Sequence, residues 1–165
     1  MSAMAVRAMT AQDASAVLAI YAEGIATGIA TFETEAPAWP DWDASHLAAC
    51  RFVAERDGRV VGWSALTPVS GRCVYRGVAE VSVYVAATER GRGMGRRLLA
   101  ELVAGSERLG LWTLQAGIFE TNAASLALHR ACGFREVGRR ERLGARDGVW
   151  HDVMLLERRS ATVGV

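Results

Sequence analysis

A glycine-rich loop between an apolar run and a helical pattern is the feature that most limits how this chain can fold. The stretch VYVAATERGRGMGRRLLAEL, from Val83 to Leu102, carries three glycines and four arginines in its middle. Glycines lower the stability of a helix start, so they are expected there when the backbone must approach something closely. The free N–H groups and the dipole of a helix N-terminus attract anions. The pattern therefore predicts a strand, an anion-binding turn and a helix in succession.

Three kinds of loop have this composition. A dinucleotide-binding fingerprint has the spacing GxGxxG and an acidic residue about 20 positions later. Here the glycines stand at every second position, and the residue at the acidic position is Gln115. A plain turn with solvated arginines gains nothing from three glycines. A cradle for a pyrophosphate uses the glycines for close approach and the arginines for charge, so the sequence favours this third interpretation.

The basic residues are nineteen arginines, and the chain contains no lysine. A P-loop needs a lysine on the phosphates, and Schiff-base or pyridoxal-phosphate chemistry needs a lysine amine, so both are excluded. The formal net charge is +1, which gives no overall field for nucleic acid, and no nucleic-acid partner is expected. The arginines of the loop are therefore a local feature suited to a small anion.

The cysteines and the hydropathy pattern bear on the cellular setting. Cys50, Cys73 and Cys132 form no CxxC pair, which argues against a disulfide framework and a zinc knuckle. The three histidines are scattered and make a poor metal set, so no metal is expected. Since no apolar run suits a signal peptide or a membrane span, the expected setting is the reducing cytoplasm without membrane contact.

Hydrophobic periodicity predicts strands and helices along the whole chain. In the first half of the chain, the expected elements are a strand over Ala5–Met9, a helix over roughly Ala11–Ala26, a helix from near Asp41, a hairpin over Arg51–Val69 that turns at Asp57-Gly58, and a strand over Tyr75–Val85. In the second half, they are a helix over Gly95–Leu109 and a strand over Leu111–Phe119. A helix capped by Asn122 and ended by Gly133 follows, and then a hairpin over Phe134–Arg142 and Val149–Glu157. The order β-α-α-β-β-β-α-β-α-β-β describes one mixed α/β domain over residues 1–165.

Two motifs in this order resemble the GNAT superfamily of acyl-CoA-dependent N-acetyltransferases. Arg90-x-x-Gly93-x-Gly95 matches its (Gln/Arg)-x-x-Gly-x-(Gly/Ala) loop, and ETNAASLALHRACGF (Glu120–Phe134) resembles its Asn-x-x-(Ala/Ser)-x-x-Leu-Tyr-x-x-x-Gly-Phe region. The resemblance implies the GNAT fold, a mixed and mostly antiparallel sheet flanked by helices and splayed at its central strands. It also implies acetyl-CoA as acetyl donor. The implied donor-binding positions are Val83, Tyr84, Val85, Arg90, Gly91, Arg92, Gly93, Met94, Gly95, Arg96, Asn122 and Ser125.

One departure narrows the resemblance. His129 stands where many GNAT members have a tyrosine that is proposed to protonate the departing thiolate. The branch of phosphinothricin and methionine sulfoximine N-acetyltransferases also has histidine there. It is similar in three further segments, TFETEAP (Thr31–Pro37), VAEVSVYV (Val78–Val85) and GVWHDV (Gly148–Val153). This branch implies acetylation of the α-amine of a small amino acid with a tetrahedral side-chain head, such as phosphinothricin, methionine sulfoximine or methionine sulfone. It also implies a homodimer.

The chemistry of acetyl transfer gives roles to these positions. An α-amine has a pKa of about 8 and must lose a proton before it attacks, and Glu80 is the candidate acceptor of that proton. Backbone N–H groups at Val83–Val85 would stabilise the oxyanion. His129 would protonate the thiolate or help Glu80 accept a proton. The candidate acceptor pocket has two walls: Phe32, Glu33 and Thr34 on one, and Tyr75 and Arg76 on the other.

Each role has a structural alternative. Glu80 could pair with an arginine, His129 could be structural, and Tyr75 and Arg76 could be exposed at a strand edge. The function also has alternatives: a GNAT enzyme acting on another small amine or on a peptide N-terminus, or a CoA-binding regulatory module without turnover. A carboxylate at position 80 favours an enzyme, because a module has no need of one. His151 and Asp152 are expected at the pocket rim, since no GxSxG elbow accompanies them.

Overall fold

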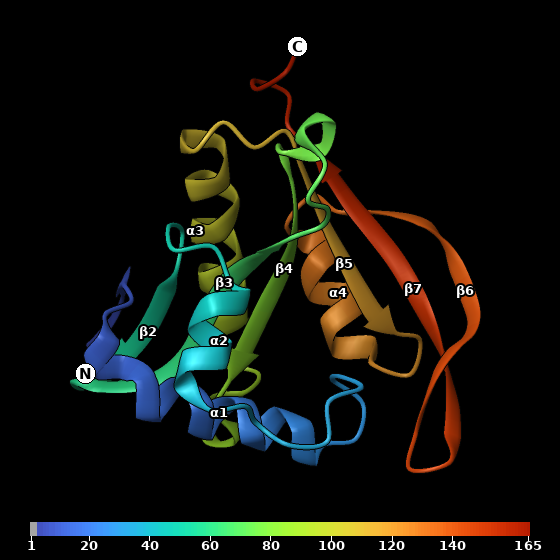
Figure 1. Cartoon of the computed structure of the whole chain (residues 1–165). Coiled ribbons are helices and arrows are strands. Elements are labelled where there is room, and N and C mark those ends of the chain that lie inside the picture. Colours follow the sequence, from blue (N-terminus) through green and yellow to red (C-terminus); the bar gives the residue numbers. More distant parts are fainter. Residues whose placement is uncertain (1–2) are drawn as a thin grey trace.

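The computed structural model describes residues 3–165, whose elements follow the predicted order (Figure 1). The strands are β1 (Met4–Ala8), β2 (Phe52–Arg56), β3 (Arg59–Pro68), β4 (Val78–Val85), β5 (Thr113–Phe119), β6 (Arg135–Arg146) and β7 (Val149–Arg159). The helices are α1 (Ala14–Ala26), α2 (Trp39–Ser45), α3 (Met94–Arg108) and α4 (Ala123–Ala131). Among the helices of residues 3–165, none combines the length and the apolar character needed to cross a bilayer.

The seven strands form one sheet in the order β1-β2-β3-β4-β5-β7-β6. Every neighbouring pair is antiparallel except β4 and β5, which run parallel. That parallel pairing is short and joins Val78–Glu80 to Thr113–Gln115. Beyond it the two strands diverge and leave a wedge in the middle of the sheet (Figure 1). The predicted fold, a mostly antiparallel sheet splayed at its central strands, is confirmed.

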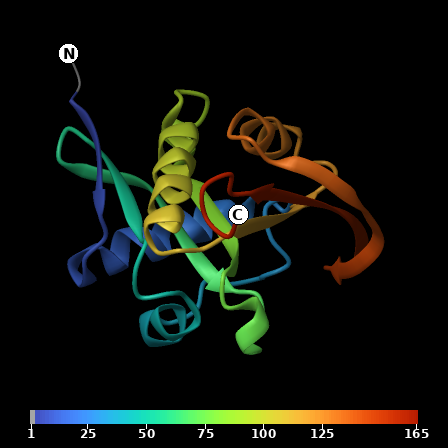
Figure 2. The same cartoon turned by 90° about the horizontal axis from the view of Figure 1, so that it is seen from above.

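The helices cover both faces of the sheet, and each face has its own apolar core. Figure 2 shows α3 and α4 on one side of the sheet and α1 and α2 on the other. The buried side chains on the first side include Leu98, Leu99, Leu102 and Leu126. Those on the second side include Val17, Ile20, Trp42 and Trp63. Each helix therefore buries one apolar face, as its hydrophobic periodicity predicts.

Local signals end several elements where the sequence predicts. Asp57 and Gly58 have φ values of +50° and +77°, so they form a tight turn between β2 and β3. Asn122 caps α4 by accepting a hydrogen bond from the N–H of Ser125, and Gly133 ends that helix at φ +90°. Short polar and glycine signals are thus sufficient to place these ends.

The strand predicted over Tyr75–Val85 begins later than expected, at Val78. A 3-10 turn occupies Cys73–Tyr75, and Gly77 separates it from β4. A Cβ added to Gly77 would lie 2.1 Å from Cε3 of Trp112, so the backbone crosses directly over the indole ring. The β-forming composition of this stretch concealed the turn, because the contact with Trp112 depends on the tertiary fold.

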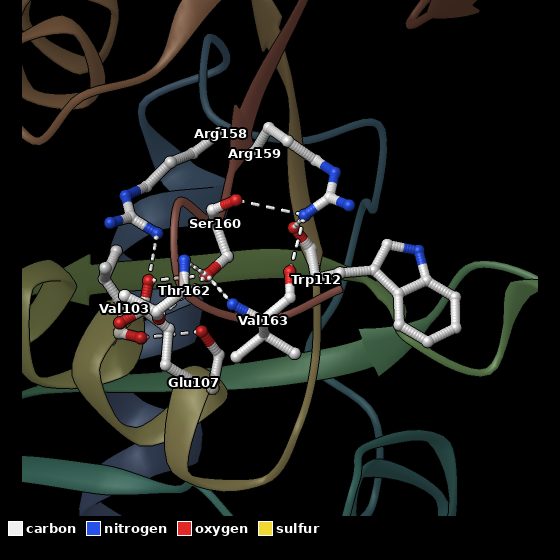
Figure 3. A network of polar contacts seen from close by, with 9 residues as sticks. Val103, Glu107, Trp112, Arg158, Arg159, Ser160, Thr162 and Val163 are labelled. Carbon is white, nitrogen blue, oxygen red and sulfur yellow. Dashed lines mark hydrogen bonds and ion pairs between the residues drawn. The ribbon is translucent and has the colours of Figure 1, made fainter. Parts of the chain in front are cut away.

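The C-terminal segment is tied to α3 by a polar network, at the end of the helix opposite the glycine loop (Figure 3). The buried Ser160 hydroxyl donates to Oε1 of Glu107 (2.9 Å) and accepts from the N–H groups of Thr162 and Val163. Nη1 of Arg158 donates to the same Glu107 oxygen (3.1 Å). The network therefore holds the last turn of the chain against the end of α3.

Candidate active site

The wedge between β4 and β5 opens into a cavity of about 840 Å³. The glycine loop, the first turns of α3 and α4, and the segment between α1 and α2 complete its lining. The N–H of Ala86 donates to the carbonyl of Val61 on β3 (2.8 Å), and backbone groups alternate in direction along a strand. The N–H groups of Val83 and Val85 therefore face away from β3 and into the wedge. Backbone donors that no strand uses thus follow one wall of the cavity.

The glycine loop forms one rim of this cavity. Gly91 and Gly93 have φ values of +76° and +82°, and apart from their chain neighbours no atom of residues 3–165 lies within 4 Å of the place where either would carry a Cβ. The loop thus combines a backbone conformation that favours glycine with open space for a ligand. Gly93 is the N-cap of α3, so the first N–H groups of this helix have no partner within it. These donors, beside Arg90 and Arg96 in the lining, fit a pyrophosphate.

The predicted donor-binding residues come together around the cavity, and all of them except Arg92 belong to its lining. The Arg92 guanidinium lies instead 3.9 Å from the carboxylate of Glu89, and its side chain is mostly exposed. The structure therefore leaves Arg92 outside the group that surrounds the wedge.

A buried ion pair, which sequence reasoning missed, holds the start of the glycine loop. Nε of Arg56 on β2 donates to Oε2 of Glu89 (2.7 Å), and Glu89 is only 8% exposed. A buried carboxylate needs such a partner to offset the loss of water. One feature of the sequence could have indicated this pair. Glu89 is an acidic residue beside an anion-binding loop, where a carboxylate without a basic partner would repel the phosphates.

Asn122 connects the two sides of the cavity. Its Oδ1 accepts from the N–H of Ser125 (3.2 Å), and its Nδ2 donates to the carbonyl of Ile29 between α1 and α2 (3.3 Å). A Cβ added to Gly95 would lie 3.2 Å from the Leu128 side chain, so α3 and α4 approach closely beside it. The start of α4 is therefore tied to the opposite wall, and the middle of α4 packs against the first turn of α3.

Glu80 lies at the closed end of the wedge, in the last position where β4 pairs with β5. Its partner in the register is Gln115, whose Nε2 donates to Oε2 of Glu80 (3.5 Å). Gly117 leaves space beside the other carboxylate oxygen. Within residues 3–165, Glu80 has this glutamine and no arginine as a hydrogen-bond partner. The carboxylate lines the cavity at the point where the two strands separate.

His129 is buried on the cavity side of α4. Its Nδ1 lies 2.7 Å from the carbonyl oxygen of Ser125. A carbonyl oxygen only accepts hydrogen bonds, so Nδ1 carries the ring proton and Nε2 keeps a lone pair. Burial lowers the pKa of His129, which keeps the imidazole neutral near pH 7.

The wall opposite the glycine loop is an aromatic stack. The Phe32 ring packs against Phe119, with centroids 4.6 Å apart, and Phe119 stacks on His151 at 4.5 Å. Gly144 on β6 makes room for Phe32, since an added Cβ would lie 3.0 Å from that ring. His151 therefore supports the wall from behind, outside the cavity lining.

Arg146 fastens the segment between α1 and α2 to the last hairpin. Its Nη2 donates to the carbonyl of Ile25 (2.8 Å), and its Nη1 donates to the carbonyl of Thr31 (3.2 Å). The aromatic stack and this arginine together position the loop that carries Phe32.

Only part of the predicted acceptor pocket comes together. Phe32 and Glu33 line the cavity, whereas Thr34 lies outside the lining. Tyr75 and Arg76 belong to the turn before β4 and are also outside it. The Arg76 guanidinium lies over the Trp112 ring, 5.5 Å from its centroid, and Tyr75 is exposed. Their separation from the cavity follows from the late start of β4.

Several lining residues were absent from the sequence expectations, namely Tyr21, Gln115, Gly117 and Arg140. The rings of Tyr21 and Tyr84 lie 4.9 Å apart, and burial raises the pKa of both phenols, so both stay protonated. In the sequence Tyr21 is one of the apolar positions of a helix, and its hydroxyl was the only sign of a second role.

Comparison with known proteins finds relatives along most of the chain. Residues 19–134 match the model of the acetyltransferase (GNAT) family. The phosphinothricin N-acetyltransferase of Alcaligenes faecalis is 40% identical over 167 residues, covering 94% of this chain and 82% of that protein. The L-methionine sulfoximine/L-methionine sulfone acetyltransferase of Pseudomonas aeruginosa is 32% identical over 155 residues, covering 88% of each.

A solved structure is similar over almost the full length. It is the crystal structure of a GNAT superfamily phosphinothricin acetyltransferase from Sinorhizobium meliloti in complex with AcCoA, with a TM-score of 0.88 at 29% identity. The match covers 98% of this chain and 90% of that one. The similarity thus extends over the strands that form the wedge and over the hairpin that completes its far wall.

Proposed function

Since this chain belongs to the acetyltransferase (GNAT) family, we propose that it transfers the acetyl group of acetyl-CoA to the α-amine of a small amino acid of the phosphinothricin and methionine sulfoximine or sulfone class. The observation that carries the proposal is the Glu80 carboxylate at the closed end of a wedge whose rim is a phosphate cradle. A CoA-binding module would need only the cradle.

The donor end of the reaction uses backbone groups. The glycine loop and the first turn of α3 would bind the pyrophosphate, with Arg90 and Arg96 supplying charge. The N–H groups of Val83 and Val85 would then stabilise the oxyanion that forms as the amine attacks the thioester carbon. Donors of this kind need no rearrangement during the reaction, because the strand already holds them.

The acceptor amine must be neutral when it attacks. Glu80 would take its proton, directly or through a water, because an α-amine with a pKa of about 8 is mostly protonated at pH 7. Gln115 orients the carboxylate through the hydrogen bond from its Nε2. The nitrogen of the tetrahedral intermediate then loses its second proton to His129 or to solvent, and the intermediate breaks its C–S bond to release the CoA thiolate and the N-acetyl amino acid.

The tautomer of His129 limits the role that the residue can have in proton transfer. Because the proton on Nδ1 is hydrogen-bonded to the carbonyl oxygen of Ser125, the neutral ring offers the substrate only the lone pair at Nε2. Such a ring accepts a proton and does not donate one to the thiolate. We therefore assign His129 to accepting or relaying the proton that leaves the amine.

The test is release of free CoA thiol from acetyl-CoA, scanned over phosphinothricin, methionine sulfoximine, methionine sulfone, the standard amino acids, polyamines and short peptides. Release with the amino acids that have tetrahedral heads is the expected result. Release only with polyamines or peptides would instead support a GNAT enzyme for another amine or a peptide N-terminus. Tight acetyl-CoA binding without release for any amine would support the regulatory module.

We further propose that the protein acts as a homodimer in the cytoplasm. The last hairpin exposes Val137, Val149 and Trp150, and these apolar side chains would be covered in a dimer. All three cysteines are free thiols, which suits a reducing compartment. Sedimentation equilibrium that gives the monomer mass at micromolar concentration would contradict the dimer.

A further inference from the structure

Three of the residues from 139 to 142 on β6 are arginines, and two of them have acidic partners. Nη1 of Arg139 lies 3.4 Å from the carboxylate of Asp152, and Nη2 of Arg142 lies 3.9 Å from that of Glu141. Arg140 lines the cavity instead. Over the range 3–165, the structure gives its guanidinium no hydrogen-bond or ion-pair partner.

The register of the sheet explains why Arg140 reaches the cavity. Arg140 pairs with Val153 on β7, and Val153 pairs with Phe119 on β5. Residues directly opposite each other on neighbouring strands share a face of the sheet. The Val153 side chain is within 3.4 Å of the place where Gly117 would carry a Cβ, beside Glu80. Arg140 therefore lies on the same face as the aromatic wall and the Glu80 carboxylate.

A β-bulge fixes this part of β6. The pairing with β7 is irregular between Arg140 and Gly144, and Arg142 adopts a φ of +44° within the irregular stretch. The N–H of Arg142 donates to Oδ1 of Asp152 (2.7 Å), which holds the bulge in place. A bulge of this kind commonly re-aims side chains beside a binding site. Leu143, within the bulge, also lines the cavity.

Groups of opposite charge, the Glu80 carboxylate and the Arg140 guanidinium, thus line opposite ends of the part of the cavity where the amino acid would bind. Glu80 is on β4 and Arg140 is on β6, three strand steps apart, or about 14 Å across the sheet at about 4.8 Å per step. Arg140 is in register with Phe119 and Glu80 with Gln115, so the two are also about 13 Å apart along the strands at about 3.3 Å per residue. The α-carboxylate of an amino acid is bonded to the same carbon as its amine, so it stays near Glu80. The group that reaches toward Arg140 is the end of the side chain.

We propose that Arg140 binds an anionic group at the end of the acceptor's side chain. The protein then prefers phosphinothricin, whose phosphinate is anionic at neutral pH, over methionine sulfone, whose sulfone head is neutral. The inference rests on the proposed function and selects within its substrate class. A guanidinium suits the task because its fork donates two hydrogen bonds to the oxygens of an oxyanion.

The experiment compares kcat and KM for the two amino acids at saturating acetyl-CoA, in the unaltered protein and in Arg140→Met, Arg140→Lys and Arg139→Met. Arg140→Met is expected to raise KM for phosphinothricin about tenfold to hundredfold, as loss of a charge-assisted hydrogen bond does, and to leave methionine sulfone within about threefold. Arg140→Lys recovers part of the loss. Arg139→Met, which removes a neighbouring charge outside the cavity, is expected to leave kcat and KM unchanged for both amino acids.

Two results overturn the inference and leave the proposed function in place: an unchanged KM for phosphinothricin in Arg140→Met, or an equal loss for both amino acids. Turnover of neither amino acid by the unaltered protein overturns the inference and the proposed function together. Arg140→Gln is measured in parallel as a second neutral variant, so that poor folding of Arg140→Met does not decide the outcome.

Discussion

Arg56 and Glu89 join β2 to the start of the glycine loop, with 2.7 Å between Nε and Oε2. Both side chains are largely buried, with 20% and 11% of their surfaces exposed. The pair lies next to Arg90, which lines the cavity, so it holds the glycine loop that follows β4 from β2, in the same half of the sheet.

Arg56→Met is expected to lower the free energy of unfolding by on the order of 3 kcal/mol, because it removes the hydrogen-bonded partner of the buried Glu89 carboxylate and leaves it only the more distant, mostly exposed Arg92. It should also weaken acetyl-CoA binding. Urea denaturation and titration calorimetry measure the two effects. The double variant Arg56→Met/Glu89→Met should recover stability, and losses that simply add would contradict the assignment. Arg135→Met removes an exposed pair with Glu157 and serves as control, at less than about 1 kcal/mol.

Gly93→Ala is expected to reduce acetyl-CoA affinity. Its φ of +82° strains any residue with a Cβ by about 1–2 kcal/mol, and the loop relaxes away from the geometry that binds the pyrophosphate. Gly58→Ala is the matched control, because Gly58 has a φ of +77° in the turn between β2 and β3. Both variants should lose similar stability in thermal melts. Equal acetyl-CoA dissociation constants for the two would show that the cradle is not the donor site.

Glu80→Gln is expected to lower kcat by about a hundredfold or more, since general base catalysis contributes about 10²–10⁴. The acetyl-CoA dissociation constant should stay unchanged, because Glu80 lies outside the cradle. Activity should recover in part as the pH rises, when the amine loses its proton to solvent instead. A variant with full activity at pH 7 would remove Glu80 from the mechanism. Glu33 is a second carboxylate of the lining, so kcat is also measured in Glu33→Gln for comparison.

His129 makes the stability of the fold depend on pH. Burial lowers its pKa from 6.5, so the unfolded chain binds a proton at a higher pH than the native protein does. The contribution of the neutral His129 ring to the free energy of unfolding is complete above pH 6.5, and it is lost as the pH falls through the pKa of His129 in the folded protein. His129→Gln should flatten the dependence of the unfolding free energy on pH in this window. His46→Gln is measured beside it, because burial lowers the pKa of His46 as well. An unaltered protein that gains stability on acidification would contradict this account.

The parts of the fold that rest on short-range signals could be predicted from the sequence. Asp57-Gly58, Asn122 and Gly133 each fix a turn or a helix end through their own backbone preferences. The glycine loop was also recognisable, because alternate glycines and arginines at a helix start suit the close approach and the charge of a bound anion.

The parts of the site that rest on tertiary register could not be predicted. The turn before β4, which removes Tyr75 and Arg76 from the cavity, depends on a contact between Gly77 and Trp112. Arg140 faces the cavity through its register with Val153, which follows a shift in the pairing of β6 with β7 between Glu136 and Gly138. A periodic pattern along one strand gives no sign of either, since each depends on a residue distant in the sequence.

The short pairing of Val78–Glu80 with Thr113–Gln115 means that the sheet is built as two halves joined at one end. Strands β1 to β4 form one half, and β5, β7 and β6 form the other. The backbone donors of Val83 and Val85 lack the neighbouring strand that would normally satisfy them. In the proposed function, acetyl-CoA lying along them would take the place of that strand. Binding this substrate and completing the sheet would then be one and the same event.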